Sequence, residues 1–224
     1  MNDLQDDREW GHNPVTGELA HVLSRPEGGR RFEVDLWLQP GAAVAGAHVH
    51  PSLIERFEVL EGDVTFLVDG AERPMRAGDG RAEVPVGVVH DWWNSGSGIA
   101  RVRVEVEAVA DAPSETAEHF IAMIETLWSL GALGKVNGKG MPDPLWLAAL
   151  AHEYRDVVRF VSPPAPVQSL LFPPLAAIAR RLARDPADPS LHGREAPIWI
   201  DDPGDGLDAF LARNVGAAAA RKHA

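Results

Sequence analysis

The stretch HVHPSLIERFEVLEG, residues 48–62, places two histidines one residue apart and follows them with a glutamate and a glycine turn. In a β-strand, side chains two residues apart point to the same side, so His48 and His50 present both imidazoles to one point. If the chain returns as an antiparallel strand after the short link PSLI, Glu55 comes to lie beside them. The stretch therefore predicts three ligands of one metal site.

A fourth ligand has to come from another strand, and PVGVVHDWWN, residues 85–94, offers His90 near the start of one. Three neutral imidazoles and one carboxylate suit a divalent transition metal and leave positions for water, dioxygen or substrate. Because the chain has no cysteine, disulfides, thiolate zinc sites and a cysteine nucleophile are excluded. We expect one metal ion held by His48, His50, Glu55 and His90.

The first half of the chain is patterned as short β-strands. RFEVDLWL (31–38) and ARVRVEVEA (100–108) alternate apolar and charged residues with a period of two, which is typical of half-buried antiparallel strands. The short runs between them are separated by Gly, Asp and Asn, as in a small barrel or sandwich. We predict a mainly β barrel over residues 1–112.

The second half changes to helical spacing. Ser114 is expected to cap one helix, and Asp143, followed by Pro144, is expected to cap a second that runs to about Val161. The segment SPPAP (162–166) ends that second helix, and a third helical stretch follows it.

The predicted organisation is thus a barrel, a helical extension over residues 113–184, and an irregular tail over residues 185–224 with a short helix near 205–213. The apolar stripes of the extension are expected to cover the barrel or to build a homodimer interface. As an alternative, residues 170–184 would form an interfacial helix whose arginines face anionic headgroups. Two prolines in that segment and the acidic net charge disfavour membrane association.

Together, the histidine and glycine spacings resemble the two motifs of the cupin superfamily. The first motif, a glycine, His-x-His, a glutamate and a second glycine, is matched by Gly41, His48, His50, Glu55 and Gly62. The second motif, a glycine, Pro-x-Gly, a histidine and an asparagine, is matched by Gly78, Pro85, Gly87, His90 and Asn94. The leading glycine of each motif stands one residue further out than in the usual pattern, which suggests a bulge in the turn near residue 78.

This resemblance covers roughly residues 10–110 and is specific, because both motifs occur in the right order. It implies a single-domain, RmlC-like cupin barrel (the double-stranded β-helix or jelly roll) with one Fe, Mn, Zn, Ni or Cu ion inside. It does not imply a reaction, since cupins include dioxygenases, isomerases, cyclases and proteins that only bind ligands.

Strand alternation also predicts the wall of a substrate pocket. The residues expected to line it are Phe57, Val59, Trp92, Leu36 and Val104. Such a wall is more often plain barrel core than a substrate pocket. No lysine or arginine is predicted on the inward face, so we expect a small, partly aromatic or apolar substrate with oxygen atoms for the metal. Asn94 is expected to bond a turn backbone rather than to act as a ligand.

Two functions remain open. The leading hypothesis is a metalloenzyme, oxygenase-, isomerase- or cyclase-like, in which the metal acts as a Lewis acid or binds dioxygen beside a chelating substrate. Glu55 is the candidate catalytic base. The alternative is a non-catalytic cupin that binds or senses a small ligand. A sensor would normally carry a DNA-binding helix-turn-helix and a basic patch, and neither is evident in the sequence.

Composition restricts the partners. A formal net charge of −12 argues against nucleic acid, which attracts basic surfaces. The acidic N-terminal residues do not predict a signal peptide, and no apolar run reaches the length of a membrane span. We expect a cytoplasmic homodimer that binds a small molecule.

Overall fold

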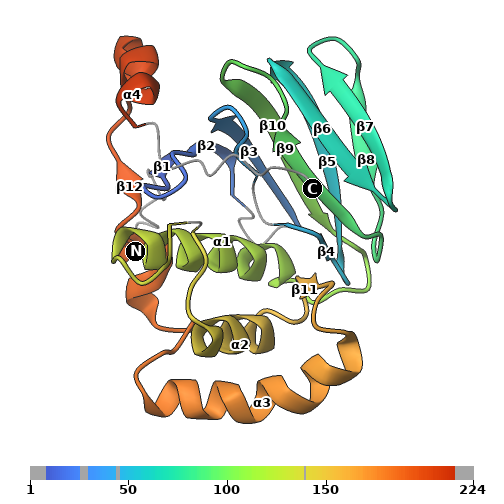
Figure 1. The fold of residues 1–224 in the computed structure, drawn as a ribbon, viewed down its shortest axis with the longest axis vertical. Coiled ribbons are helices and arrows are strands. Elements are labelled where there is room, and N and C mark those ends of the chain that lie inside the picture. The colour runs from blue at the N-terminus through green and yellow to red at the C-terminus, as the bar shows by residue number, and fades with distance from the viewer. Residues whose placement is uncertain (1–8, 26–29, 44–45, 139, 215–224) are drawn as a thin grey trace, which may run out of the picture.

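The computed structural model describes residues 9–25, 30–43, 46–138 and 140–214, and the strands in these ranges form two antiparallel sheets that face each other (Figure 1). The first sheet contains, in spatial order, β12 (Trp199–Ile200), β1 (Trp10–His12), β2 (Leu19–Ser24), β3 (Arg31–Leu38), β10 (Ala100–Ala108), β5 (Leu53–Glu61) and β8 (Arg81–Val84). The second contains β11 (Arg159–Phe160), β4 (His48–Val49), β9 (His90–Asn94), β6 (Asp63–Val68) and β7 (Ala71–Arg76). The predicted mainly β barrel is confirmed.

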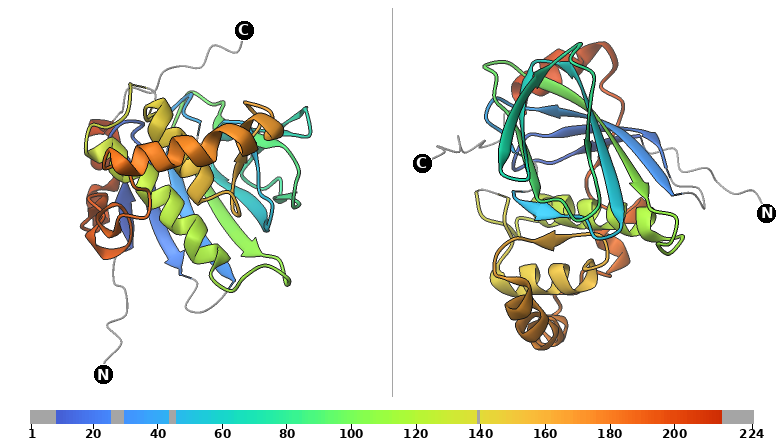
Figure 2. Two further views of the ribbon diagram at one scale, coloured as in Figure 1. Left: turned by 90° about the horizontal axis from the view of Figure 1, so that it is seen from below. Right: turned by 90° about the vertical axis from the view of Figure 1, so that its right-hand side faces the viewer.

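Three of the described α-helices, α1, α2 and α3, gather at one end of the barrel, whereas α4 lies apart from them near β1 and β12 (Figure 1). Figures 1 and 2 show α1 lying across that end, with α2 and then α3 in layers beyond it. The α-helices are α1 (Thr116–Ala132), α2 (Pro144–Glu153), α3 (Ala165–Arg181) and α4 (Leu207–Arg213). Three 3-10 turns lie in the tail, η1 (Pro189–Leu191), η2 (Gly193–Glu195) and η3 (Gly204–Gly206). The helical extension that was predicted after the barrel is confirmed.

The two strands with the clearest alternation, β3 and β10, pair directly. Val34 lies opposite Val104 in the register, and both side chains are buried in the core. On the outer face, Asp35 is fully buried under the guanidinium groups of Arg101 and Arg103. These arginines lower the pKa of Asp35 although its burial raises it, so the carboxylate stays charged. Alternation thus separates an apolar interior from a face of ion pairs.

The predicted helix boundaries were right at one end of α2 and wrong at the other. Asp143 caps α2 by accepting hydrogen bonds from the backbone N–H groups of Leu145 and Trp146, at 2.9 and 3.1 Å. The helix ends at Glu153, however, and not near Val161. The chain turns there because residues 159–160 form β11 and pair with β4, and this tertiary pairing outweighs the local helical pattern.

The predicted cap of α1 was also wrong. Glu115, not Ser114, occupies the N-cap position, and no side chain caps the helix. The Ser114 hydroxyl donates instead to the Glu115 carboxylate at 3.0 Å. A serine before an apolar stripe is therefore a weaker signal here than Asp-Pro is before α2.

The third predicted helix is confirmed as α3, which packs on α2 through small residues such as Ala149 and Ala176. Its outer face leaves Leu170 and Ile178 exposed. Among the described helices, none combines the length and the hydrophobicity that a membrane crossing requires.

The tail is less irregular than predicted. Its short helix is confirmed as α4, but residues 199–200 also form β12 and pair with β1. A strand of two residues shows no periodicity, so the sequence pattern could not reveal it. Because β11 and β12 join the barrel sheets, the extension and the tail each contribute a strand to them. The boundaries after residues 112 and 184 stay predictions.

Gly62 gives a test of why the barrel needs glycine between β5 and β6. It has a φ of +78°, and a Cβ there would lie 2.8 Å from the carbonyl oxygen of Ile99. Gly70 has almost the same φ, +79°, but open space around the Cβ position. We expect Gly70→Ala to lower the free energy of unfolding by about 1–2 kcal/mol through backbone strain alone. Gly62→Ala should cost about 1–3 kcal/mol more because the backbone must also shift.

Chemical denaturation of the two glycine variants measures this difference. Equal losses in both variants would show that the close approach to Ile99 does not constrain the turn.

Candidate metal centre

Three histidines and one glutamate converge between the two sheets, and we call His48, His50, Glu55 and His90 the centre. Single ligand atoms of all four lie within 4.8 Å of one another. His48 of β4 pairs in register with His90 of β9 in one sheet, while Glu55 reaches them from β5 of the other sheet. The fold thus brings together all four residues that the sequence pattern singled out.

The centre is buried. The exposed fractions are 6% for His48, 2% for His50, 5% for Glu55 and 1% for His90. Four ionisable groups away from water are costly unless hydrogen bonds or a bound cation compensate them. The groups around each imidazole therefore decide what the centre can hold.

Each imidazole has a backbone carbonyl oxygen at its Nδ1. The distances are 2.6 Å from His48 to Gly46, 2.5 Å from His50 to Val157 and 3.0 Å from His90 to Val88. A carbonyl oxygen only accepts, so each Nδ1 carries the proton and donates it. In the neutral ring, Nε2 is then left with a lone pair, and the three Nε2 atoms are the ones that face the centre.

The spacing of the inward-facing Nε2 atoms and the Glu55 carboxylate suits binding of a shared cation better than direct hydrogen bonds between them. The Nε2 atoms of His48 and His50 lie 3.1 Å apart, and that of His50 lies 3.4 Å from the Glu55 carboxylate. Two ligands that are each about 2.1 Å from one metal ion would be about 3.0–3.4 Å apart in octahedral or tetrahedral geometry. Both the spacing and the donor set therefore match a divalent transition metal.

The pKa values within the centre favour the metal-binding protonation states of two members. Burial, and then the neighbouring His50 and His90, lower the pKa of His48 to about 3, so this imidazole is neutral near pH 7. Burial raises the pKa of Glu55, but the charges and hydrogen bonds of His50 and His90 outweigh it and lower the pKa below its usual range.

His90 differs, because its Nε2 lies closer to the Glu55 carboxylate than that of His50 does. The Nε2 of His90 and the Oε2 of Glu55 are 2.8 Å apart, and although burial lowers the pKa of His90, this bond to Glu55 raises it overall. A proton on His90 Nε2 would be donated to Glu55 and would neutralise part of the charge of the centre. A metal ion would replace that proton, because a ligating imidazole must give up its Nε2 proton.

The helical extension takes part in the centre, which the sequence pattern did not reveal. The carbonyl of Val157 that accepts from His50 lies in the turn between α2 and β11, and the Phe120 ring of α1 contacts the His50 ring edge-on at 5.5 Å. Phe160 of β11 pairs with His48 of β4. The predicted helix ran through residue 157 to about Val161, and a helical residue at that place would not offer its carbonyl to the barrel.

Asn94, the last residue of the second motif, has a structural role as predicted. Its side-chain amide donates to the carbonyls of Leu38 and Gly98 at 2.9 and 2.8 Å, and its oxygen accepts from the N–H of Gly96. It thereby closes the turn after β9, and both ends of its side-chain amide are bound to backbone groups.

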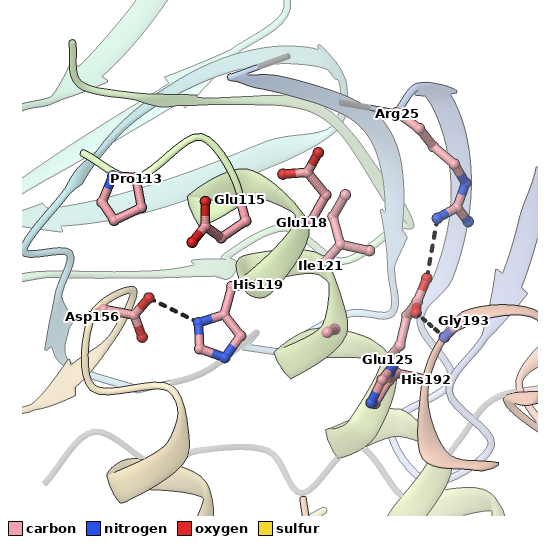
Figure 3. A pocket seen from close by; sticks show the side chains of 11 residues that line it. Arg25, Pro113, Glu115, Glu118, His119, Ile121, Glu125, Asp156, His192 and Gly193 are labelled. Carbon is pink, nitrogen blue, oxygen red and sulfur yellow. Dashed lines mark hydrogen bonds and ion pairs between the residues drawn. The ribbon is translucent and has the colours of Figure 1, made fainter. Parts of the chain in front are cut away.

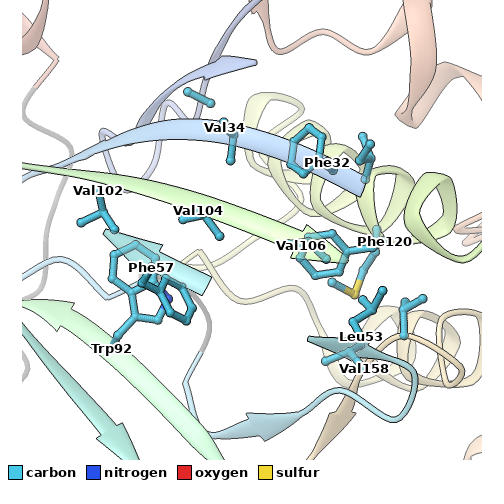
Figure 4. Close-up of a cluster of buried hydrophobic side chains, with 14 of the residues drawn as sticks. Phe32, Val34, Leu53, Phe57, Trp92, Val102, Val104, Val106, Phe120 and Val158 are labelled. Atoms are coloured by element: carbon cyan, nitrogen blue, oxygen red, sulfur yellow. The ribbon is translucent and has the colours of Figure 1, made fainter. Parts of the chain in front are cut away.

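A cavity of about 180 Å³ opens from the centre, and we call it the chamber. His48, His50 and Glu55 form part of its wall. Of the residues predicted to line a pocket, the chamber is lined by Leu36, Phe57, Trp92 and Val104. Val59 is buried in the surrounding core and is not among the lining residues (Figure 4 shows part of this cluster).

A second hollow of about 640 Å³ is lined by residues of α1 and by parts of the chain that pack beside it (Figure 3). Most of its charged groups have partners, although the Oε2 atom of Glu118 is buried without a hydrogen-bond partner among the described residues. His119 lies 2.8 Å from Asp156, and Glu125 accepts from both Arg25 and the N–H of Gly193. We therefore take the centre and the chamber, rather than this open hollow, as the candidate site.

Comparison with family models matches residues 36–107 to Cupin_2, described as a cupin domain. A comparison with curated proteins found no match. Similar solved structures include a cupin-superfamily sugar phosphate isomerase from Silicibacter pomeroyi, with 24% identity, a TM-score of 0.41, and coverage of 46% of this chain and 73% of that one.

Two further solved structures share this similarity. For the cupin domain of Cnp3 from Schizosaccharomyces pombe, the identity is 20%, the TM-score is 0.38, and the coverage is 41% of this chain and 65% of that one. For the Cupin_2 domain of an XRE family transcriptional regulator from Enterobacter cloacae, the identity is 20% and the TM-score is 0.37. The match covers 42% of this chain and 98% of that one.

The ion pair between His119 and Asp156 gives a pH-dependent prediction, because it joins α1 to the turn that carries Val157. The hydrogen bond to Asp156 raises the pKa of His119, and the charge of Glu153 raises it further. Burial and Arg155 lower this pKa, but the net shift is upward. The stabilisation is therefore complete below the ordinary histidine pKa of about 6.5 and is lost as the pH rises through the raised value. For a partly exposed pair this loss should not exceed about 1 kcal/mol.

Melting temperatures of wild type and Asp156→Asn between pH 5.5 and 9 test the pair. The wild type should lose stability across this range, whereas Asp156→Asn should lack that component. The exposed Asp111→Asn, which changes the same charge elsewhere, should behave like wild type. The same loss in Asp156→Asn as in wild type would contradict the assignment.

Proposed function

We propose that the chain, whose residues 36–107 match a cupin domain, is a metalloenzyme that acts on a small organic molecule. One divalent metal ion, Fe, Mn, Zn, Ni or Cu, would be held by the imidazoles of His48, His50 and His90 and the carboxylate of Glu55. The single observation that carries the proposal is the set of three inward Nε2 atoms, each fixed by a carbonyl at Nδ1, around one buried carboxylate.

The proposed roles follow from these contacts. When bound, the metal would supply Lewis acidity or a binding place for dioxygen, as in an isomerase-, cyclase- or oxygenase-like enzyme. The carbonyls of Gly46, Val88 and Val157 hold the imidazoles in the tautomer that leaves Nε2 free to ligate. Glu55, which stays ionised and borders the chamber, is the proposed base that takes a proton from a substrate.

Several accompanying expectations stay predictions. These are the homodimer, the cytoplasmic location, the absence of a nucleic-acid partner and the division into barrel, extension and tail. The rival function is a cupin that binds a small ligand without transforming it. Binding without turnover separates this rival from the enzyme.

Metal analysis of protein purified without chelators tests the ligand set. We expect about one equivalent of a divalent transition metal in wild type and at least a tenfold lower affinity in His48→Ala and in His90→Ala. His152→Ala, which removes a histidine of α2 outside the centre, should retain the wild-type content. Negligible metal in wild type and variants alike would overturn the proposal.

Glu55→Gln tests the proposed base. The amide has nearly the same shape but no charge, so metal affinity should fall less than in Glu55→Ala, while turnover should fall by about 10²–10⁴-fold. Oxygen uptake and product analysis with diketones and catechols on Fe(II)-loaded protein measure turnover. Binding of these compounds with no product from wild type would favour the rival function.

A further inference from the structure

The chamber is built jointly by the barrel and the extension. On the barrel side it is lined by Phe32, Val34, Leu36, Phe57, Trp92 and Val104. Opposite them, α1 contributes Phe120, Ile121, Met123, Ile124, Leu127 and Trp128. In Figure 4 the ring of Phe120 projects from α1 toward the β-strands that carry Val106 and Phe32. The amphipathic helix α1 therefore makes the largest part of the wall that faces the β-strands, and Leu147, Val158, Phe160, Ile198 and Trp199 complete it.

The spacing on α1 explains how one helix can provide most of this wall. The apolar lining residues come in adjacent pairs, 120–121, 123–124 and 127–128, which recur after three or four residues, so they form one broad face along the helix, on which Glu125 also lies. The other side of α1 carries polar groups such as His119, which binds Asp156. α1 is thus fixed in rotation, and its broad apolar face lines the chamber.

The size of the chamber limits its ligand. Its volume is about 180 Å³. A dry apolar cavity of about 150 Å³ in another protein holds benzene, so this chamber has room for about one ring or a short branched chain with small substituents. A sugar phosphate or a multi-ring compound would need more space.

The charge of the lining limits the ligand further. No lysine or arginine is found among the described residues that line the chamber. Its two carboxylates are Glu55 of the centre and Glu125, and the latter is bound by Arg25. An anionic group away from the centre would therefore be buried without a partner, which is costly.

We infer that the chamber binds a compact, uncharged aromatic or branched aliphatic molecule whose oxygen atoms face the centre, and that α1 selects it by size. The orientation toward a metal rests on the proposed function. The chamber itself does not, because most of its wall consists of apolar side chains that need no metal.

Two probes separate these parts. p-Cresol has the size of the chamber and tests the apolar walls in EDTA-treated protein, while benzoate has a similar size and a negative charge. We expect p-cresol to bind at least tenfold tighter than benzoate in a calorimetric titration. Catechol, with two adjacent oxygens, should gain at least a further tenfold over p-cresol only when the protein is loaded with Fe(II) or Zn(II).

Variants in α1 locate the binding. Ile124→Trp fills the chamber and should weaken p-cresol at least tenfold, whereas the matched Ile178→Trp on the exposed face of α3 should bind like wild type. Val34→Phe fills the chamber from the barrel wall and serves where Ile124→Trp does not fold, as judged by thermal melting. Ile124→Ala enlarges the chamber and should bind 4-tert-butylcatechol at least fivefold tighter than wild type does.

The outcomes decide between the two proposals. Unchanged p-cresol binding in both filling variants, or equal binding of benzoate and p-cresol, would overturn the inference about the chamber. If the filling variants abolish p-cresol binding, the inference about the chamber is supported. If the same protein takes up no metal, only the proposed function is overturned.

Discussion

The arrangement of the core depends on one electrostatic constraint. Two imidazole nitrogens face each other at 3.1 Å, and both carry lone pairs when their rings are neutral and their Nδ1 protons are bound to carbonyls. Neither can satisfy the other, so a proton or a cation has to lie between them and the neighbouring carboxylate. Holding such mutually repelling groups together requires a rigid frame, which β4 and β9, paired in one sheet, and β5 of the other sheet supply.

The outer and inner faces of the barrel strands carry different kinds of side chain. The outer face of β3, β5 and β10 carries charged side chains that pair with one another, such as Asp35 with Arg103 and Arg56 with Glu105. The inner face of these strands carries aliphatic and aromatic side chains such as Val34, Phe57 and Val104, together with Glu55 of the centre. A low-dielectric wall around few polar groups strengthens every interaction made there. The same alternation that folds the barrel therefore also prepares a site in which a small change of charge has a large effect.

Sequence pattern was sufficient for those features that depend on local or fixed spacing. The period of two in β3 and β10, the His-x-His pair and the Asp-Pro cap of α2 each have a direct physical cause in a few neighbouring residues. Features that depend on tertiary contact were missed. The helical pattern through Val157 gave no sign that the chain would turn to pair with β4, and the two-residue strand β12 is too short to show a period. The donors to the centre were thus predictable, whereas the carbonyls that orient them were not, because a backbone oxygen leaves no mark in the sequence.

The hydrogen bond from His50 to the carbonyl of Val157 couples cation binding at the centre to the folding of the helical extension, and the coupling acts in both directions. Whatever free energy a cation gains from the correct orientation of His50 is returned, by thermodynamic reciprocity, to the turn that provides the carbonyl. The helices would then be more firmly ordered in a loaded molecule than in an empty one. The same coupling constrains evolution. A barrel that lost these helices would lose both the carbonyl that orients His50 and the helices that cover its end.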